Sequence, residues 1–288
     1  FNHFKDMSHW LPWALGKDAN AEDMPLWIAP DKKLDVAIME ACMRDHYEGT
    51  PLSLDHDIAQ GNWDCPYRPT PLQYEVDGKK YFNERPTSTQ QTGFSYVAQL
   101  RSWLPRELCG ILWFGNDDGN MIAYVPIYCS NTERAECFNT PGADAVTFSD
   151  KNAFWVCNWV SNMVYPRYSQ LFPSLKAVRD SLENAYFAAQ PEVEAKALSL
   201  YKTDKSAAVK YLNDYSIQKS NEMLARWKQL AIYLIVKYND MAVKPEKDGK
   251  FLKTPTGLGE RVARPGYSDY MKHEIVKQTG DKYAVPTK

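Results

Sequence analysis

Cys42 and His46 are the first residues along the chain whose types and spacing could do chemistry. They lie four apart in residues 36–46, a segment with an apolar stripe at helical spacing that follows Asp35, a favourable N-cap residue. On a helix the two side chains would share a face, and a cysteine beside a histidine can act as a nucleophile with its base. The alternative is a buried cysteine and a histidine that stabilises the negative end of the helix.

Two acidic clusters offer possible ligands for a metal ion. Residues 55–57 (Asp-His-Asp) are adjacent, and adjacent side chains rarely converge on one ion without a turn. Residues 116–120 (Asn-Asp-Asp-Gly-Asn) resemble the start of a calcium-binding loop, but the twelfth position counted from Asp117 is Tyr128, where such a loop needs Glu. We therefore expect a polar loop at the first cluster, a hairpin turn at the second, and no metal site.

The sequence contains none of the common catalytic and cofactor motifs. There is no G-x-S-x-G, H-E-x-x-H, phosphate-binding loop or dinucleotide fingerprint, so no cofactor is expected. No two of the six cysteines have C-x-x-C spacing, which leaves a zinc site without support. The cysteines stand at positions 42, 65, 109, 129, 137 and 157.

Charge and hydropathy exclude two further classes of protein. The 288 residues include 34 Lys and Arg against 36 Asp and Glu, a net charge of −2 that does not support nucleic-acid binding. The longest uninterrupted apolar run, residues 230–236, has seven residues. A membrane-spanning helix needs about 20. We therefore expect neither a nucleic-acid partner nor a membrane span.

Aromatic residues are abundant, with 9 Trp, 18 Tyr and 11 Phe. Most of the tryptophans fall in apolar segments, where packing in the core is the default. Trp10, Trp13 and Trp63 fall instead in segments expected to be loops. They could line a cleft, and they are the basis of an alternative function, a non-catalytic module that binds a peptide or a glycan.

Residues 72–148 are predicted to form an antiparallel sheet. Polar and apolar residues alternate on both sides of Asp77-Gly78, a strong hairpin signal, and residues 88–101 indicate a further strand. A second hairpin is expected from the two apolar segments that flank residues 116–120.

From about residue 150 the pattern becomes helical. Pro191 is well placed for the first turn of a helix, and strands followed by helices indicate an α+β fold. The expected helices cover residues 152–164, 174–190, 191–212 and 215–241. The chain is accordingly divided into a mostly antiparallel β portion with one early helix (1–150), a helical region (151–243) and a tail that wraps a surface (244–288).

Five stretches of the sequence resemble a known protein family. The longest and most specific is residues 89–105, Thr-Gln-Gln-Thr-Gly-Phe-Ser-Tyr-Val-Ala-Gln-Leu-Arg-Ser-Trp-Leu-Pro. The others are residues 43–51 (Met-Arg-Asp-His-Tyr-Glu-Gly-Thr-Pro), 110–115 (Gly-Ile-Leu-Trp-Phe-Gly), 124–128 (Tyr-Val-Pro-Ile-Tyr) and 154–162 (Phe-Trp-Val-Cys-Asn-Trp-Val-Ser-Asn). Together they resemble the C-terminal half of bacterial cysteine dipeptidases related to secernins, over about residues 1–285.

This resemblance implies an N-terminal-nucleophile hydrolase with a four-layer αββα sandwich. The nucleophile of such an enzyme is a cysteine at the mature N-terminus, and a short peptide is hydrolysed by acyl transfer to water through a thioester. The α-amine of that cysteine acts as the base, because it titrates at about pH 8 and can be neutral at working pH. Backbone or asparagine donors would stabilise the oxyanion.

The resemblance also implies that part of the enzyme precedes this sequence. Residue 1 is Phe and none of the six cysteines is N-terminal, so the nucleophile is expected in a preceding half. That half would be the partner of this chain, and a dipeptide or short peptide its substrate. An export signal, if there is one, would also lie there, and the compartment stays unassigned. The helices within residues 174–243 could serve as a homo-oligomer surface.

No residue of this chain is assigned a catalytic role, but four are candidates for a substrate pocket. Arg101, which ends the Gln-Leu-Arg match, could recognise a substrate carboxylate or stabilise developing negative charge, or it could form a structural ion pair at a strand end. Gln91 and Thr92 could line the pocket from the same strand. Asn116 could donate to the oxyanion or serve as a turn residue.

Overall fold

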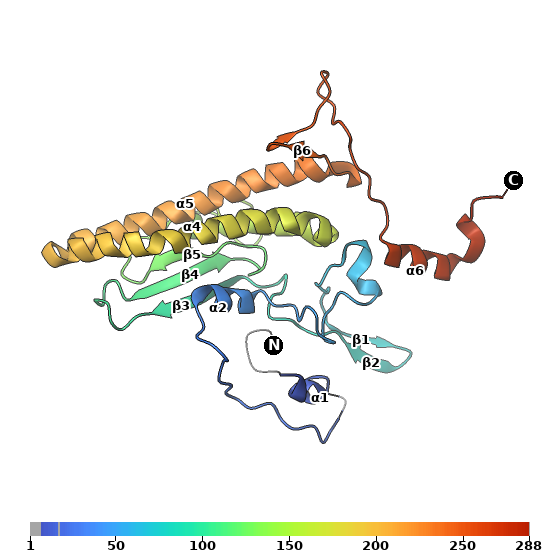
Figure 1. Cartoon of the computed structure of the whole chain (residues 1–288), viewed down its shortest axis with the longest axis horizontal. Helices are drawn as coiled ribbons and strands as arrows, with labels where there is room; N and C mark the ends of the chain where they lie inside the picture. The colour runs from blue at the N-terminus through green and yellow to red at the C-terminus, as the bar shows by residue number, and fades with distance from the viewer. Residues whose placement is uncertain (1–6, 17, 288) are drawn as a thin grey trace.

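The protein is a mixed α+β fold, seen in a computed structural model that describes residues 7–16 and 18–287. Two long helices, α4 (Tyr168–Thr203) and α5 (Lys205–Tyr238), lie side by side over one face of a three-stranded antiparallel sheet (Figure 1). The three-stranded sheet precedes the long helices along the chain, as predicted. The expectation of a preceding half rests in part on Phe1, and this residue lies outside the described ranges.

The remaining elements are short. The other helices are α1 (Leu11–Ala14), α2 (Val36–Met43), α3 (Ala153–Val164) and α6 (Asp269–Thr279). The strands are β1 (Gln73–Val76), β2 (Lys79–Phe82), β3 (Phe94–Leu100), β4 (Gly110–Asn116), β5 (Val125–Tyr128), β6 (Glu246–Lys247) and β7 (Lys250–Phe251). The 3₁₀ turns are η1 (Ser8–Trp10), η2 (Ile58–Trp63), η3 (Glu136–Phe138), η4 (Tyr165–Arg167), η5 (Asn239–Met241) and η6 (Gly280–Tyr283).

The three-stranded sheet has β4 at its centre and two unlike faces. Val97 of β3 and Pro126 of β5 are both paired with Trp113 of β4, and Val97 and Trp113 are buried against the helices. Side chains alternate between faces along a strand, so the residues between them lie on the opposite face. That face is largely open: its exposed or half-buried members are Phe94, Tyr96, Ala98, Leu100, Leu112, Phe114 and Ile127.

The core lies between this sheet and helices α3, α4 and α5. α3 was expected to be buried because it is apolar nearly all round, and Val156, Cys157 and Val160 are fully buried. Trp227 of α5 is also fully buried, and its indole Nε1 donates a hydrogen bond of 3.3 Å to the carbonyl of Met121. The helices therefore hold the sheet on one side only, and the described residues do not form the four-layer sandwich.

Residues 72–148 do not form one sheet, which corrects the prediction. β1 and β2 pair only with each other, around Asp77 and Gly78, which both have positive φ. The hairpin turn is thus confirmed, but every residue of the two strands is exposed. The alternation of polar and apolar residues in this segment does not mark a buried face.

The strand predicted over residues 88–101 is shorter than expected. Thr92 donates its backbone N–H to the carbonyl of Thr89 at 3.1 Å, which closes a turn, and β3 begins only at Phe94. In the second hairpin β5 begins at Val125, so residues 117–124 form a loop between β4 and β5.

The helix boundary predicted at Pro191 is wrong. α4 continues through Pro173 and Pro191 and ends at Thr203. Each proline removes one backbone hydrogen bond, at a cost of about 3 kcal/mol in a helix interior. Val193 and Ala197 are buried directly after Pro191, and burial of such side chains offsets that cost.

The break between the long helices falls at Asp204 rather than near residue 212. The Asp204 carboxylate accepts hydrogen bonds from the amides of Ser206 and Ala207, at 2.8 and 3.1 Å, and so caps α5.

In the described part of the chain no helix is both long and apolar enough to cross a membrane.

The C-terminal tail, residues 244–288, carries β6, β7 and α6. It reaches back to the N-terminal third of the chain at Asn62. The Asn62 side chain donates to the carbonyl of Gly266 at 3.1 Å and accepts from the amide of Ser268 at 2.6 Å. These bonds hold the start of α6 beside η2.

Candidate functional site

Three of the four predicted pocket residues meet at one end of the sheet. Gln91 and Thr92 lie in the turn before β3, and Asn116 is the last residue of β4. The backbone N–H of Asp117 donates to the carbonyl of Gly93 at 2.9 Å, which joins the turn to the strand end. Gln91 is exposed, and Thr92 and Asn116 are half-buried. Gln91 and Thr92 therefore lie in a turn, not in the strand that was predicted.

Arg101 lies at the opposite end of β3, about 23 Å from Phe94 at the usual rise of a strand. Its guanidinium is buried and forms an ion pair with Glu194 of α4. It also donates to the carbonyls of Leu108 at 2.8 Å and Cys109 at 3.4 Å. All three guanidinium nitrogens of Arg101 therefore have hydrogen-bond partners within the protein. This geometry matches the structural ion pair, the second of the two roles considered for Arg101 from the sequence.

Behind Asn116 the chain forms a loop, residues 117–124, in which every residue is buried. A buried loop is unusual because its backbone polar groups cannot bond to water. The loop begins with Asp117, whose φ of 81° lies in the region that glycine favours. Its polar groups are bonded instead by side chains from the surrounding helices.

Asp117 is anchored on α3. Its carboxylate accepts hydrogen bonds from the amide of Asn158 at 3.1 Å and from the hydroxyl of Ser161 at 2.6 Å. Burial raises the pKa of Asp117 to about 7, although these bonds favour the charged form. This carboxyl group can therefore change charge near neutral pH.

Asp118 is held by hydroxyl groups. Its carboxylate accepts hydrogen bonds from Ser88 and, at 3.1 Å, from Tyr165. Tyr168 is part of the same cluster, because its hydroxyl accepts a hydrogen bond of 3.0 Å from the Asn120 amide. Burial raises the pKa of Tyr165 and Tyr168, so both remain neutral donors or acceptors.

A chain of buried charges lies on the helix side of the loop. Arg44, just after α2, forms an ion pair with Glu183 of α4 and lies 3.8 Å from the Glu40 carboxylate. Burial raises the pKa of Glu40 to about 9, and the nearby charge of Glu183 acts in the same direction. Glu40 is therefore protonated at neutral pH, and the Arg44–Glu183 pair carries the opposed charges.

The Cys42–His46 pair does not form. α2 ends at Met43, so His46 is not on the helix with Cys42. The buried His46 ring places Nδ1 3.1 Å from the Glu48 carboxylate, and no hydrogen bond joins it to Cys42 within the described residues. Burial raises the pKa of Cys42, which disfavours the thiolate.

Two of the other candidates from the sequence, Asp57 and Trp63, make structural contacts. Asp57 caps η2 by accepting from the amide of Ala59 at 2.8 Å. Among residues 7–16 and 18–287 no three His, Cys, Asp or Glu side chains gather as a metal site. Trp63 packs under the guanidinium of Arg167, 5.6 Å from the ring centre. Trp10 and Trp13 lie in the short turns η1 and α1.

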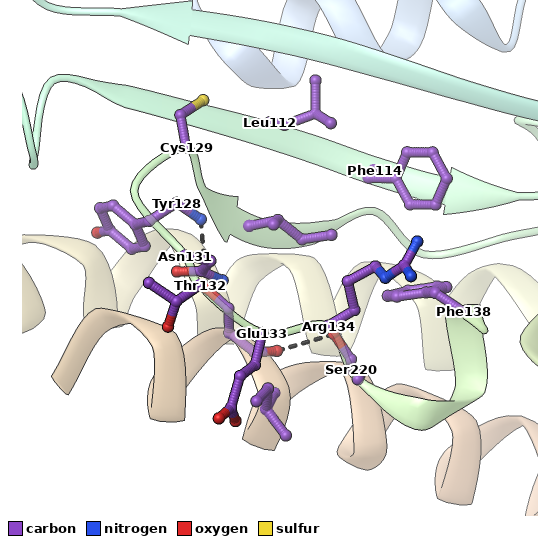
Figure 2. Close-up of a pocket in the computed structure, with 14 residues that line it drawn as sticks. Leu112, Phe114, Tyr128, Cys129, Asn131, Thr132, Glu133, Arg134, Phe138 and Ser220 are labelled. Atoms are coloured by element: carbon purple, nitrogen blue, oxygen red, sulfur yellow. Dashed lines mark hydrogen bonds between the residues drawn. The ribbon is translucent and has the colours of Figure 1, made fainter. Parts of the chain in front are cut away.

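A separate cavity of about 550 Å³ lies at the β5 side of the sheet, between β4, β5, the residues after β5 and α5 (Figure 2). Leu112 and Phe114 line it from β4, and Phe138 lines it from η3. The Ser216 hydroxyl of α5 accepts the amide of Tyr128 at 3.2 Å on its wall. The pocket residues predicted from the sequence do not line this cavity.

Sequence reasoning missed the buried charges behind the sheet end. Residues 116–120 were interpreted as a surface turn, because Asp and Gly are typical of turns. A signal was present: the two acids stand between apolar segments, residues 110–115 and 121–128. Arg44 and Glu183, which bond the backbone of residues 119 and 124 in the same loop, are far away along the chain, so no local pattern connects them to it.

Comparison with known proteins shows a family match that covers the sheet and the loop. Residues 3–181 match the model of peptidase family C69, and this match includes the sheet and the loop behind Asn116. "Probable dipeptidase B" of Streptococcus pyogenes serotype M1 is 22% identical over 220 residues, which cover 76% of this chain and 41% of that protein. The chain therefore spans about two-fifths of the length of the curated relative.

Proposed function

Because the chain belongs to peptidase family C69, we propose that it is the C-terminal part of a cysteine dipeptidase that hydrolyses short peptides through a thioester. The match over residues 3–181 is the observation that carries the peptidase part of this proposal. It includes the sheet end where Gln91, Thr92 and Asn116 come together. In this proposal a preceding segment supplies an N-terminal cysteine as nucleophile, with its own α-amine as the base.

Five of the six cysteines of this chain support a nucleophile from elsewhere. A reactive cysteine needs a lowered pKa, since the thiolate attacks the substrate. Burial instead raises the pKa of Cys42, Cys65, Cys129, Cys137 and Cys157.

The open face of the sheet supports a second sheet from the preceding segment. Phe94 and Leu100 are 58% and 75% exposed, and Tyr96 lies between them on the same face. A sheet buries one apolar face on another layer, and the helices occupy only the other side. A second sheet over this face, with its own layer of helices, would complete the αββα sandwich.

The two edges of the sheet also differ, because one is closed to further strands and the other is open to them. Along the outer edge of β5, Tyr124 and Tyr128 donate their amides to Glu183 at 2.9 Å and Ser216 at 3.2 Å, and Pro126 has no amide to donate. That edge is therefore closed to further strands. Among the described residues β3 pairs with β4 alone, so its outer edge is where additional strands would join.

Asn116 is the proposed oxyanion donor of this chain. Its side-chain amide makes no hydrogen bond within the described residues, and neither does that of Gln91, so both can bind substrate. An amide held 2.7–3.1 Å from a developing oxyanion lowers the barrier to acyl transfer. Arg101, already paired with Glu194, we assign to support of the sheet rather than to substrate.

The test compares this chain with the complete protein on a panel of unblocked dipeptides, with release of free amino acids as the readout. Only the complete protein is expected to be active, and N-terminal sequencing should find cysteine at the start of its processed chain. Replacing that cysteine by alanine should abolish activity, whereas Cys42→Ala should not. A complete protein that hydrolyses no dipeptide would overturn the proposal.

A further inference from the structure

Three consecutive carbonyls of the buried loop are each bonded by a side chain from a different element. The carbonyl of residue 119 accepts from Arg44 Nε at 3.0 Å, just after α2. The carbonyl of residue 120 accepts from Arg179 of α4 at 2.7 Å. The carbonyl of residue 121 accepts from Trp227 of α5 at 3.3 Å. The loop is therefore fixed from three directions at once.

Glu183 connects these contacts to the end of the loop. Its carboxylate forms the ion pair with Arg44 and also accepts the backbone amide of Tyr124 at 2.9 Å. Arg179 reaches the loop a second time, since it also donates to the Asn120 side-chain oxygen at 3.0 Å. One carboxylate and two guanidiniums thus hold the middle and the C-terminal end of the loop.

We infer that Arg44, Arg179 and Glu183 form a clamp that positions Asn116 for the hydrolytic reaction. This inference rests on the proposed function. Asn116 directly precedes the loop, and Asp117 ties that junction to α3 by two hydrogen bonds. We expect a shift of the carbonyls at residues 119–121 to move Asn116, because the residues that connect them are all buried.

Charged side chains suit this task for a geometric reason. The Arg44 guanidinium donates to a carbonyl and a carboxylate in fixed directions, which a lysine ammonium cannot reproduce. Removing one partner of a buried ion pair leaves an uncompensated charge, which destabilises the structure around it. Moving the loop away from these charges would therefore cost stability. The three residues touch no proposed substrate group and are positioning residues.

Gly119 shows how closely the loop is held. A Cβ built at this position would lie 3.0 Å from the Tyr124 hydroxyl and 3.1 Å from the carbonyl of Met43. An alanine here would require these neighbours to move by a few tenths of an ångström. We therefore expect Gly119→Ala to displace the loop while leaving every charge of the clamp in place.

The experiment measures kcat and KM of the complete protein on its best unblocked dipeptide for Arg44→Lys, Glu183→Gln and Gly119→Ala. An oxyanion donor acts in the transition state, so kcat should fall about 100-fold while KM stays within about threefold. Arg167→Lys is the control: Arg167 is buried and donates to the carbonyls of Tyr238 and Ala242, which are not part of the loop. It should lower stability and leave kcat within about twofold of the wild type.

Hydrogen exchange of the amides in residues 117–124 supplies a readout that does not depend on activity. The three clamp variants should lose protection in this loop, and Arg167→Lys should not. Unchanged exchange, or a fall in kcat no larger than that of Arg167→Lys, would overturn the clamp. If the wild type hydrolyses no dipeptide, the proposed function fails, and the exchange data alone decide whether the clamp exists.

Discussion

The carboxylate of Asp117, at the end of β4, accepts a hydrogen bond from the hydroxyl of Ser161 in α3, with Oδ2 and Oγ 2.6 Å apart. This bond joins the sheet end that carries Asn116 to a fully buried part of the helical layer. Because the same carboxyl group has a pKa of about 7, the junction changes its charge near neutral pH.

The stability of the chain should therefore fall as the pH rises. The pKa of Asp117 is raised from 3.8 to about 7, so between these values the folded state binds a proton that the unfolded state has lost. Stability decreases across this window and the loss is complete above it. Urea unfolding at pH 5 and pH 8 should show the decrease, and Asp117→Asn should reduce it. An equal decrease in the variant would contradict the assignment of this pH dependence to Asp117.

Glu40 should tolerate replacement by glutamine at pH 7. Its pKa is about 9, so the wild-type side chain is already neutral and an amide of similar shape changes little. We expect Glu40→Gln to alter the free energy of unfolding by less than about 1 kcal/mol. Glu183→Gln is the control, because Glu183 forms the ion pair with Arg44 and its loss should cost about 3–5 kcal/mol. Equal losses in the two variants would show that Glu40 is charged.

Arg101→Ala should destabilise the fold without affecting substrate binding. It removes one partner of the buried pair with Glu194, at a cost of about 3–5 kcal/mol. Thermal or urea unfolding of the chain measures this loss, and KM of the complete protein should stay within about twofold. A large rise in KM with little loss of stability would assign Arg101 to the substrate pocket instead.

Substitutions on the open sheet face should act differently in the chain and in the complete protein. Leu100 is 75% exposed here, so Leu100→Lys should change the stability of this chain by less than about 0.5 kcal/mol. The same change should destabilise the complete protein, where a second sheet is proposed to cover this face. Val97→Lys, on the buried face, should destabilise both. A complete protein that tolerates Leu100→Lys would show that nothing packs there.

The local features of the chain could be predicted from the sequence because they depend on neighbouring residues. Asp35 caps α2 by accepting the amide of Ile38 at 2.8 Å, and Asp77-Gly78 forms the hairpin turn. The all-round apolar pattern of residues 152–164 indicated a buried helix, which α3 confirms. The motif at residues 89–105 pointed to the peptidase family without any structure.

The sequence by itself thus determined the fold class, several turns and caps, and the family. Only the tertiary structure decided that Arg101 pairs with Glu194, that α4 passes through Pro191, and that the acids after Asn116 are buried. The physical reason is sequence separation. Arg44 is 75 residues and Glu183 is 59 residues away along the chain from the loop residue that each one bonds. No local sequence pattern can therefore predict that these charges are buried together.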